Sequence, residues 1–212
     1  MNDVEPTAFE RGIDLDRVVN FSDAVFAIAM TVLVLAVTVP DVPSGRLGKA
    51  LGDQLPAIWS YFLSFGVIAL YWLAHHRLFH WVRRVDFRTL LLNLVLLSLI
   101  AIVPFPTDLL GRYGNTRIGT MSYAAAATAV GVASVLLWAH VSRTPGLLRP
   151  ETPRSFVKHA QLRGITVPLV FALSIPIALW NVDAAKYFWI AIVPMRIALV
   201  RRFGSVYAPR PE

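Results

Sequence analysis

One acidic side chain stands inside the first apolar stretch of the chain. Asp23 follows Phe21 and Ser22, precedes the uncharged run AVFAIAMTVLVL, and lies six residues after Arg17. If this run crosses a bilayer, a carboxylate within it costs about 2.5–3.5 kcal/mol on insertion scales unless it is paired or faces water. Asp23 therefore needs a hydrogen-bonding or ionic partner.

The sequence allows two interpretations of Ser22 and Asp23. In the first, both side chains join a buried polar network whose other members are Arg17, His75, His76 and Asn93. Six residues correspond to about 600° of helical rotation, so Arg17 and Asp23 do not share a helix face, and neighbouring helices must complete the network. In the second, Ser22 and Asp23 form a first-turn cap that the helix dipole stabilises.

Three histidines, His75, His76 and His80, raise the question of a metal site. His76 and His80 are four residues apart and share one helix face, as metal ligands often do. No acid or cysteine accompanies them, so we expect hydrogen-bonding and packing roles and no metal. The sequence also lacks a phosphate-binding glycine loop and the HExxH and GxSxG patterns, so it indicates neither an enzyme nor a cofactor.

The composition indicates an integral membrane protein. Of the 212 residues, 56% are hydrophobic and 16% are charged, and the mean hydropathy is +0.59. A helix of about 20 apolar residues spans a bilayer. We therefore predict one all-α domain over residues 1–212 with six transmembrane helices, at 18–39, 55–75, 88–106, 118–140, 164–182 and 184–200.

The basic residues predict the orientation of these helices. Fourteen Lys and Arg residues fall in the tails and loops on the side of the N-terminus, and five fall in the loops on the other side. This bias predicts a multi-pass protein of the cell membrane with both termini cytoplasmic, and aromatic residues near span ends, Trp72 included, are expected to be interfacial anchors. The net charge of +7 then indicates contact with lipid headgroups, and no nucleic-acid binding is expected.

One face of the first predicted helix carries a regular stripe. Ile28, Thr31, Val32 and Leu35 follow the spacing of a single helix face. On a lone helix such a stripe is ordinary lipid-facing or core-facing surface. Around a symmetry axis, several copies would form an apolar constriction with hydroxyl rings, in which Ile28 and Leu35 stack about 10 Å apart and exclude ions by dewetting.

Three segments of the chain carry a specific resemblance. They are Arg17-x-x-x-Phe21-Ser22-Asp23, FGVIALYWLAHHRLF and LLNLVLLSLIAIVPFPTDLL. Together they closely resemble the bacterial relatives of the endolysosomal potassium channel, the transmembrane protein 175 family. The resemblance covers the first three predicted spans in detail, and the last three only by number and length.

The resemblance implies a leak channel for potassium and other monovalent cations, with the first helix of each subunit lining a central pore. A chain with one motif corresponds to one six-helix repeat, which implies a homotetramer. The narrowest layer of the family pore maps onto Ile28, and the following layers map onto Val32 and Leu35. The hydroxyl linked to cation preference maps onto Thr31. The motif that contains Asp23 is expected to tie the first helix to its neighbours.

Two other classes of membrane protein stay open. No TVGYG-like segment joins two predicted spans, so a carbonyl filter is not expected, and hydrophobic rings predict a modest preference for potassium. A secondary transporter would use a fifth span broken at Pro168 and Pro176. A membrane scaffold would use the small-residue face of the fourth span, around Gly131.

Overall fold

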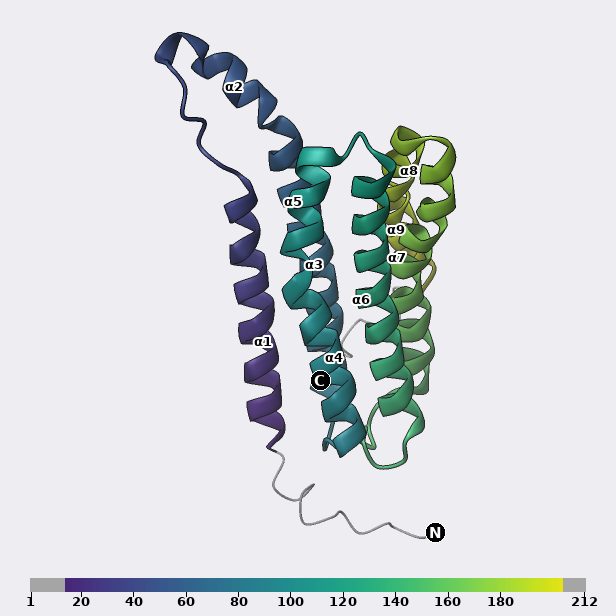
Figure 1. The fold of residues 1–212 in the computed structure, drawn as a ribbon. Helices are drawn as coiled ribbons and strands as arrows, with labels where there is room; N and C mark the ends of the chain where they lie inside the picture. The colour runs from purple at the N-terminus through teal and green to yellow at the C-terminus, as the bar shows by residue number, and fades with distance from the viewer. Residues whose placement is uncertain (1–13, 204–212) are drawn as a thin grey trace.

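A computed structural model describes residues 14–203, and this part of the chain is dominated by α-helices that run up and down side by side (Figure 1). The long helices are α1 (Leu15–Val32), α3 (Leu55–Trp81), α4 (Phe87–Ile102), α6 (Arg117–Arg143) and α7 (Arg154–Trp180). The shorter ones are α2 (Leu47–Asp53), α5 (Pro104–Tyr113), α8 (Val182–Trp189) and α9 (Ile192–Phe203). Two 3-10 turns complete the set, η2 (Leu33–Ala36) at the end of α1 and η3 (Ser44–Arg46) before α2.

Five segments of the described chain are long and apolar enough to cross a membrane, at residues 15–36, 55–81, 87–113, 117–143 and 154–180. They overlap the first five predicted spans. The third runs past its predicted end at Pro106, because α4 is followed directly by α5. Pro104 opens α5, where its missing N–H breaks no helical hydrogen bond, so it starts a helix there.

The predicted sixth span, residues 184–200, is not one continuous helix. The structure divides it into α8 and α9, which are separated by a two-residue turn. The turn falls at residues 190–191, and Pro194 lies in the first turn of α9, where a missing N–H breaks no helical hydrogen bond and proline favours the start of a new helix. Trp189 Nε1 donates to Ser174 Oγ at 2.8 Å, so α8 folds back along α7.

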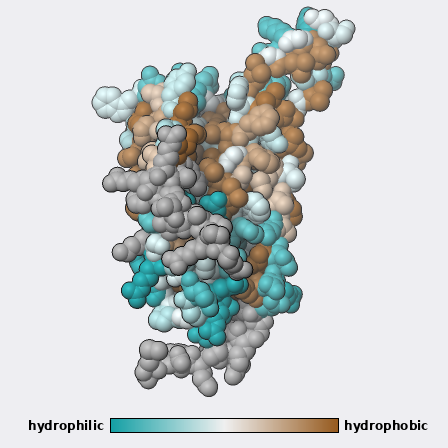
Figure 2. Space-filling view, turned by 180° about the vertical axis from the view of Figure 1, so that it is seen from behind, coloured by the Kyte–Doolittle hydropathy of each residue, from teal (hydrophilic) through white to brown (hydrophobic). Residues whose placement is uncertain are grey.

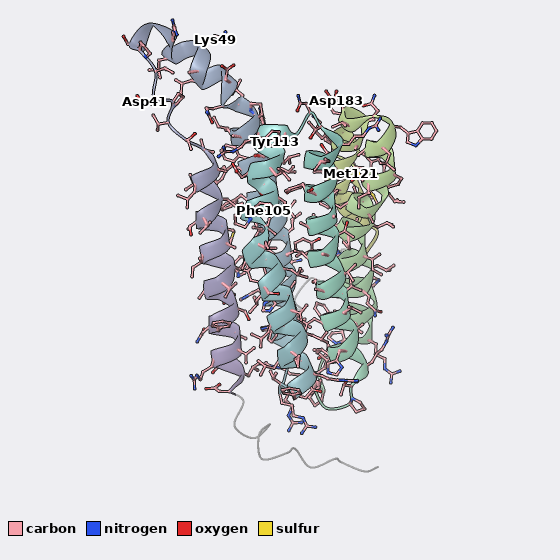
Figure 3. The ribbon with its side chains drawn as sticks, viewed as in Figure 1. Asp41, Lys49, Phe105, Tyr113, Met121 and Asp183 are labelled. Atoms are coloured by element: carbon pink, nitrogen blue, oxygen red, sulfur yellow. The ribbon has the colours of Figure 1, made fainter. Side chains whose placement is uncertain are left out.

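The two ends of the bundle differ in character. Figure 2 shows a mainly hydrophilic surface at the lower end, where α1 begins, and more apolar surface above it. The upper end carries Asp41, Lys49, Tyr113 and Asp183, and α2 projects there beyond the other helices (Figure 3). The apolar band between two polar ends is the surface expected of a chain that crosses a bilayer.

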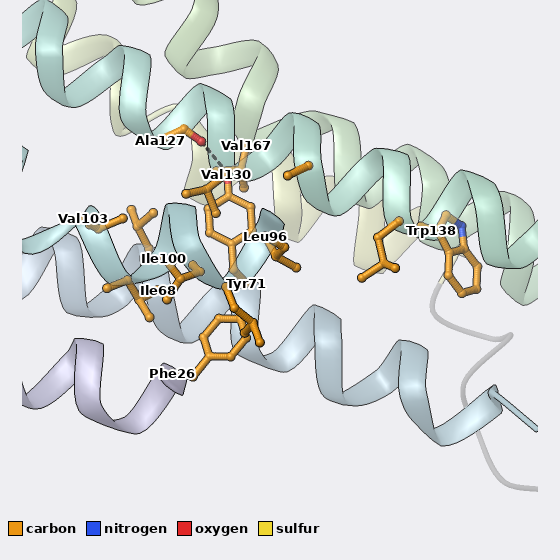
Figure 4. Close-up of a cluster of buried hydrophobic side chains, with 14 of the residues drawn as sticks. Phe26, Ile68, Tyr71, Leu96, Ile100, Val103, Ala127, Val130, Trp138 and Val167 are labelled. Atoms are coloured by element: carbon orange, nitrogen blue, oxygen red, sulfur yellow. Dashed lines mark hydrogen bonds between the residues drawn. The ribbon is translucent and has the colours of Figure 1, made fainter. Parts of the chain in front are cut away.

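The core lies between α3, α4, α6 and α7, and α1 packs along one edge of it. α1 contacts α3 and α4, and η2 contacts α3 and α5. In Figure 4, Phe26 of α1 meets Ile68 and Tyr71 of α3 within the buried cluster. The Tyr71 hydroxyl donates to the carbonyl of Ala127 at 3.0 Å, and this partner matters because a buried unpaired polar group costs about 1–3 kcal/mol.

α6 and α7 make the most extensive helix contact of the described bundle. Gly131 of α6 lies against Pro168 of α7, so closely that a Cβ added to Gly131 would collide with the Cβ of Pro168. Ala124 and Ala127 are buried along the same helix, so small residues of α6 serve packing within the protomer. α7 runs through Pro168 and Pro176 without being divided into the half-helices of a transporter.

The loops at the lower end are joined to each other. The N–H of Arg83 donates to the carbonyl of Leu147 at 2.8 Å, and the N–H of Arg149 donates to the carbonyl of Trp81 at 2.9 Å. These bonds hold the α3–α4 loop against the α6–α7 loop. The relative positions of α3, α4, α6 and α7 are therefore fixed at this end by backbone contacts as well as by the core.

Asp86 connects the start of α4 to the end of α6. Its carboxylate accepts hydrogen bonds from the Thr89 N–H at 2.7 Å and from His140 Nε2 at 3.0 Å. Burial by itself raises the pKa of Asp86, but the hydrogen bonds from Thr89 and His140 outweigh burial, so the pKa lies below its ordinary value. Asp86 is consequently ionised in the folded protein at neutral pH.

Gly131→Ala should lower the thermal unfolding midpoint of the purified protein in detergent. The added methyl group would meet the rigid ring of Pro168, and overpacking of this kind costs about 1–3 kcal/mol. Gly66→Ala is the matched control, because a Cβ on Gly66 of α3 meets nothing within 4 Å. Equal midpoints for the two variants would contradict the described contact of α6 with α7.

Asp86→Asn should lower the unfolding midpoint at pH 7 and have progressively less effect as the pH is reduced. A carboxylate with a depressed folded-state pKa stabilises the protein above its unfolded pKa, about 4, and this stability is lost as the pH falls through the folded pKa. Glu151→Gln, at an exposed position of the α6–α7 loop, is the control. A deficit for Asp86→Asn that is the same at pH 7 and pH 3 would contradict this account.

Candidate functional site

α1 has one face packed against the bundle. Its buried side chains are Ser22, Phe26, Ala29 and Leu33, with Leu33 in the η2 turn, and each is at most 3% exposed. Their spacing of four, three and four residues follows one side of a helix. This buried face meets α3 and α4 below and α5 above, so it decides how α1 is rotated in the protomer.

The opposite face of α1 is uncovered in the protomer. Ile28 is 61% exposed, Val32 is 37% exposed and Leu35 is 71% exposed. Thr31 is exposed as well, and its hydroxyl donates to the carbonyl of Ile28 at 2.8 Å. All four residues of the predicted stripe therefore lie on the exposed side of α1. Phe21, at 55% exposure, takes no part in the packing of the buried face.

A chain of hydrogen bonds ties the buried face of α1 to α4 and α3. Ser22 Oγ donates to the carbonyl of Val18 at 2.7 Å and accepts from Asn93 Nδ2 at 2.9 Å. Asn93 Oδ1 lies 2.9 Å from His75 Nε2. Because the amide oxygen can only accept, His75 Nε2 carries the proton, which leaves Nδ1 of the neutral ring as an acceptor. We call this set the Ser22–Asn93–His75 network.

Asp23 has a partner that the sequence did not predict. Trp72 Nε1 donates to Asp23 Oδ1 at 2.8 Å, and the ring of His76 lies against Trp72 with its centroid at 5.7 Å. Adjacent residues of a helix point about 100° apart, so Ser22 faces Asn93 while Asp23 reaches Trp72. Asp23 is thus held beside the network and not by the histidines or Asn93.

The start of α1 excludes the capping interpretation of Ser22 and Asp23. α1 begins at Leu15, and the Asp14 carboxylate caps it by accepting a hydrogen bond from the Asp16 N–H at 2.9 Å. Ser22 and Asp23 therefore lie in the third turn.

Arg17 does not cap the cluster. It is exposed in the first turn of α1, and within residues 14–203 no hydrogen bond or salt bridge joins it to Asp23 or to the Ser22–Asn93–His75 network. Six helical residues separate Arg17 from Asp23 by about 9 Å along the axis. The distance explains why the arginine stays outside the cluster.

Trp72 is the site residue that sequence analysis missed. Its position near a span end predicts an interfacial anchor, whereas the structure uses its indole N–H to hold Asp23. An indole N–H inside an apolar stretch needs an acceptor. The sequence analysis gave Asp23 the donors Arg17, His75, His76 and Asn93, so Trp72 was not considered as its partner. The available signal was one acid and one indole N–H, each within an apolar stretch.

The histidines of α3 serve hydrogen bonding and packing. His75 stacks on Phe79 with ring centroids 4.3 Å apart, in addition to its bond with Asn93, and His80 lies against Trp81. Within residues 14–203, no group of three or more His, Cys, Asp or Glu side chains is placed to hold a metal ion.

This chain is similar to known proteins in both sequence and architecture. Residues 17–104 match the family described as endosomal/lysosomal potassium channel TMEM175. A potassium channel of Streptomyces collinus is 37% identical over 168 residues, which are 76% of this chain and 81% of the relative. The endosomal/lysosomal proton channel TMEM175 of Mus musculus is 28% identical over 167 residues, which are 74% of this chain and 34% of the relative.

A solved structure shares the fold. The crystal structure of a lysosomal potassium-selective channel TMEM175 homolog from Chamaesiphon minutus superposes with a TM-score of 0.76 at 29% identity, covering 89% of this chain and 97% of that chain. The described bundle thus has the architecture of a membrane channel subunit. The chain belongs to the TMEM175 family, and its predicted all-α membrane fold is confirmed in the described residues, although not with six continuous spans.

Asn93→Leu should destabilise the protein, because it leaves the His75 Nε2–H buried without an acceptor. A stranded buried donor costs about 1–3 kcal/mol. Ser98→Ala on the same helix is the control, since the Ser98 hydroxyl is exposed and bonds to the carbonyl of Val95. Thermal unfolding is measured for Asn93→Leu, for Ser22→Ala and for the double variant. The double variant should lose less stability than the sum of the losses in the two single variants. Full additivity would contradict the Ser22–Asn93 bond.

Proposed function

We propose that four copies of this chain form a potassium-permeable cation channel whose pore is lined by the exposed face of α1. The observation that carries the proposal is the contrast between the two faces of α1. One face is held by the Ser22–Asn93–His75 network, whereas Ile28 and Leu35 on the other are more than half exposed in the protomer. Relatives in the same family bear the name potassium channel, which supports this function.

The proposal requires an oligomer. One helix cannot enclose a water-filled path, and a closed cyclic arrangement is the usual way for identical subunits to do so. Four subunits follow from the family resemblance, because this chain carries one Phe21-Ser22-Asp23 motif and hence one repeat. Each subunit would contribute one α1 to the wall of the pore.

The 3-10 turn η2 changes the expected geometry of the pore face. Side chains three residues apart eclipse each other in a 3-10 helix, so Val32 and Leu35 would stand one above the other along the pore. With a rise of about 2.0 Å per 3-10 residue, Leu35 lies about 12 Å beyond Ile28 along the axis rather than about 10 Å. The constriction would therefore comprise Ile28 at one end and the Val32–Leu35 pair at the other.

Thr31 would supply the polar groups of this constriction. Its hydroxyl hydrogen is directed to the carbonyl of Ile28, so the oxygen lone pairs stay available to a cation. Apolar rings exclude a cation because it must shed water with nothing to replace it, and the Thr31 oxygens would restore part of this coordination. Hydroxyl oxygens and apolar rings discriminate weakly, so the preference for potassium over sodium would be modest.

We also propose that the lower end of the bundle is cytoplasmic in a multi-pass protein of the cell membrane. The joined loops there carry Arg83, Arg84 and Arg149, and cytoplasmic loops are enriched in such residues. Residues 1–13 and 204–212 lie outside the described part of the chain. The cytoplasmic position of both termini is therefore a proposal. It rests on the bias of basic residues in the sequence and on the start of α1 at the lower end of the bundle.

Flux through purified protein in liposomes separates this proposal from its alternatives. Passive, voltage-driven potassium flux is expected for a channel, saturable flux coupled to a second solute for a transporter, and no flux for a scaffold. A pH-sensitive dye in the same vesicles reports whether protons also pass. Coupled flux or an absence of flux would overturn the proposal.

Ile28→Asn should raise the basal cation current and weaken the preference for potassium, because it wets the narrowest ring with little change in bulk. Thr31→Val should mainly lower that preference, since it removes the hydroxyl and keeps the shape. Val25→Asn is the control, because Val25 packs against the core and should impair folding more than permeation. Current amplitude and reversal potential under bi-ionic potassium and sodium give both quantities. If only Val25→Asn changes permeation, the pore face has been assigned wrongly.

Native mass spectrometry of the conducting preparation should show a tetramer. A homotetramer places four copies of α1 around one axis, which is the arrangement that the constriction requires. One part of the sample is released from detergent for mass spectrometry. The other part is reconstituted in parallel to show that the protein conducts. A conducting preparation that contains only monomers or dimers would contradict the assembly.

A further inference from the structure

An open groove lies on the surface of the protomer, where α4, α6 and α7 meet. Its volume is about 440 Å³. α6 contributes small side chains to it, and α4 and α7 contribute larger ones. Val95, Val132 and Leu136 of the groove are about half exposed, so the groove faces outward from the bundle. Residues that line it include Leu92, Val95 and Leu99 of α4, Ala125 and Ala129 of α6, and Ile175 of α7.

The groove matches a hydrocarbon chain in polarity and in length. Thr128 is the one lining residue with a polar side chain, and its hydroxyl donates to the carbonyl of Ala124 at 2.7 Å. The lining residues of α6 extend from Ala125 to Leu136, which is about 16 Å along the helix axis. One leaflet contributes about half of a hydrocarbon core of about 30 Å. The groove is therefore about as long as one leaflet is deep.

Two arginines continue the lining faces toward the lower end of the bundle, where α4 begins and α6 ends (Figure 1). Arg88 precedes Leu92 by four residues on α4, and Arg143 follows Leu136 by seven residues on α6. Both spacings keep the residues on one helix face. Arg88 is thus about 6 Å and Arg143 about 10 Å beyond the groove along the helix axes. Both arginines belong at the depth where headgroups follow the hydrocarbon.

The charge of these arginines is not balanced within the described part of the chain. Both side chains are exposed, and within residues 14–203 neither forms a salt bridge. Asp86, which joins the start of α4 to the end of α6, already accepts hydrogen bonds from Thr89 and His140. A guanidinium group binds phosphate oxygens through paired N–H donors. The lower end of the groove therefore offers two cations that suit a phosphate group.

We propose that this groove binds one anionic phospholipid per protomer. One acyl chain lies along α6 between α4 and α7, and the phosphate group binds Arg88 and Arg143. The acyl chain supplies the apolar contact that the groove lacks in the protomer, and the negative headgroup supplies the counter-charge. A second copy of the chain could cover the apolar part, but it would bring no phosphate to the two arginines. The bound lipid would hold together the three helices that line the groove.

Native mass spectrometry of the full chain in detergent tests the site, with dioleoyl phosphatidylglycerol and dioleoyl phosphatidylcholine as probes. The two lipids share their acyl chains and differ in net charge, so one phosphatidylglycerol per protomer should be retained in preference. The double variant Arg88→Gln/Arg143→Gln should lose about 25-fold in affinity for phosphatidylglycerol, at about fivefold for each arginine. Equal retention of both lipids by the unaltered protein would overturn the proposal.

Arg149→Gln is the charge control, because Arg149 is an exposed arginine of the α6–α7 loop outside the groove. It should change the affinity for phosphatidylglycerol by less than twofold. A loss per arginine as large as in the double variant would mean that any positive charge at this end attracts the lipid, which would overturn the proposal.

Ala129→Leu tests the acyl-chain part of the site, since a leucine there would fill the groove. It should reduce the retained phosphatidylglycerol, whereas Ala101→Leu, at an exposed position of α4 outside the groove, should not. Unchanged lipid retention in Ala129→Leu would overturn the proposal, and a simultaneous loss of subunits would identify the groove as a contact between copies. If Ala129→Leu does not fold, the arginine variants decide. No ion flux is measured, so failure here is distinct from failure of the proposed channel function.

Discussion

A polar side chain between apolar helices must find its hydrogen-bond partners within the protein, and Asn93 meets this requirement for three helices at once. It donates to Ser22 of α1 and accepts from His75 of α3 while it sits on α4. In hydrocarbon each unpaired group would cost several kcal/mol. A rotation of α1 would break the bond to Ser22, and it would also separate Asp23 from Trp72. The network thereby fixes which face of α1 is left uncovered.

The rest of the bundle gives this network a rigid support. The contact of Gly131 with Pro168 brings α6 and α7 together, and Tyr71 joins α3 to α6 through the carbonyl of Ala127. The joined loops and Asp86 hold the same helices at the lower end. Among the long helices of the described part, α1 packs along one edge of the bundle, against α3 and α4. Its apolar face with Ile28 is therefore left uncovered and is available for contact with other copies of the chain.

Much of this arrangement could be predicted from the sequence, but not all of it. Apolar runs locate five spans, and Ser22, His75 and Asn93 stand out because polar residues are rare within them. The pairing of Asp23 with Trp72 depends on how α1 and α3 are rotated against each other, which helical spacing within one segment does not reveal.

Other departures have local causes. The last predicted span is divided by a turn at residues 190–191, with Pro194 in the first turn of the helix that follows, and a count of apolar residues does not register such a turn. Cysteine scanning of α1 tests the central claim most directly, because the sequence contains no cysteine of its own. Under a charged, water-soluble thiol reagent, cysteines at Ile28, Thr31 and Leu35 should react and alter the current, whereas cysteines at Phe26 and Leu33 should not. Reaction at the buried positions alone would contradict the account.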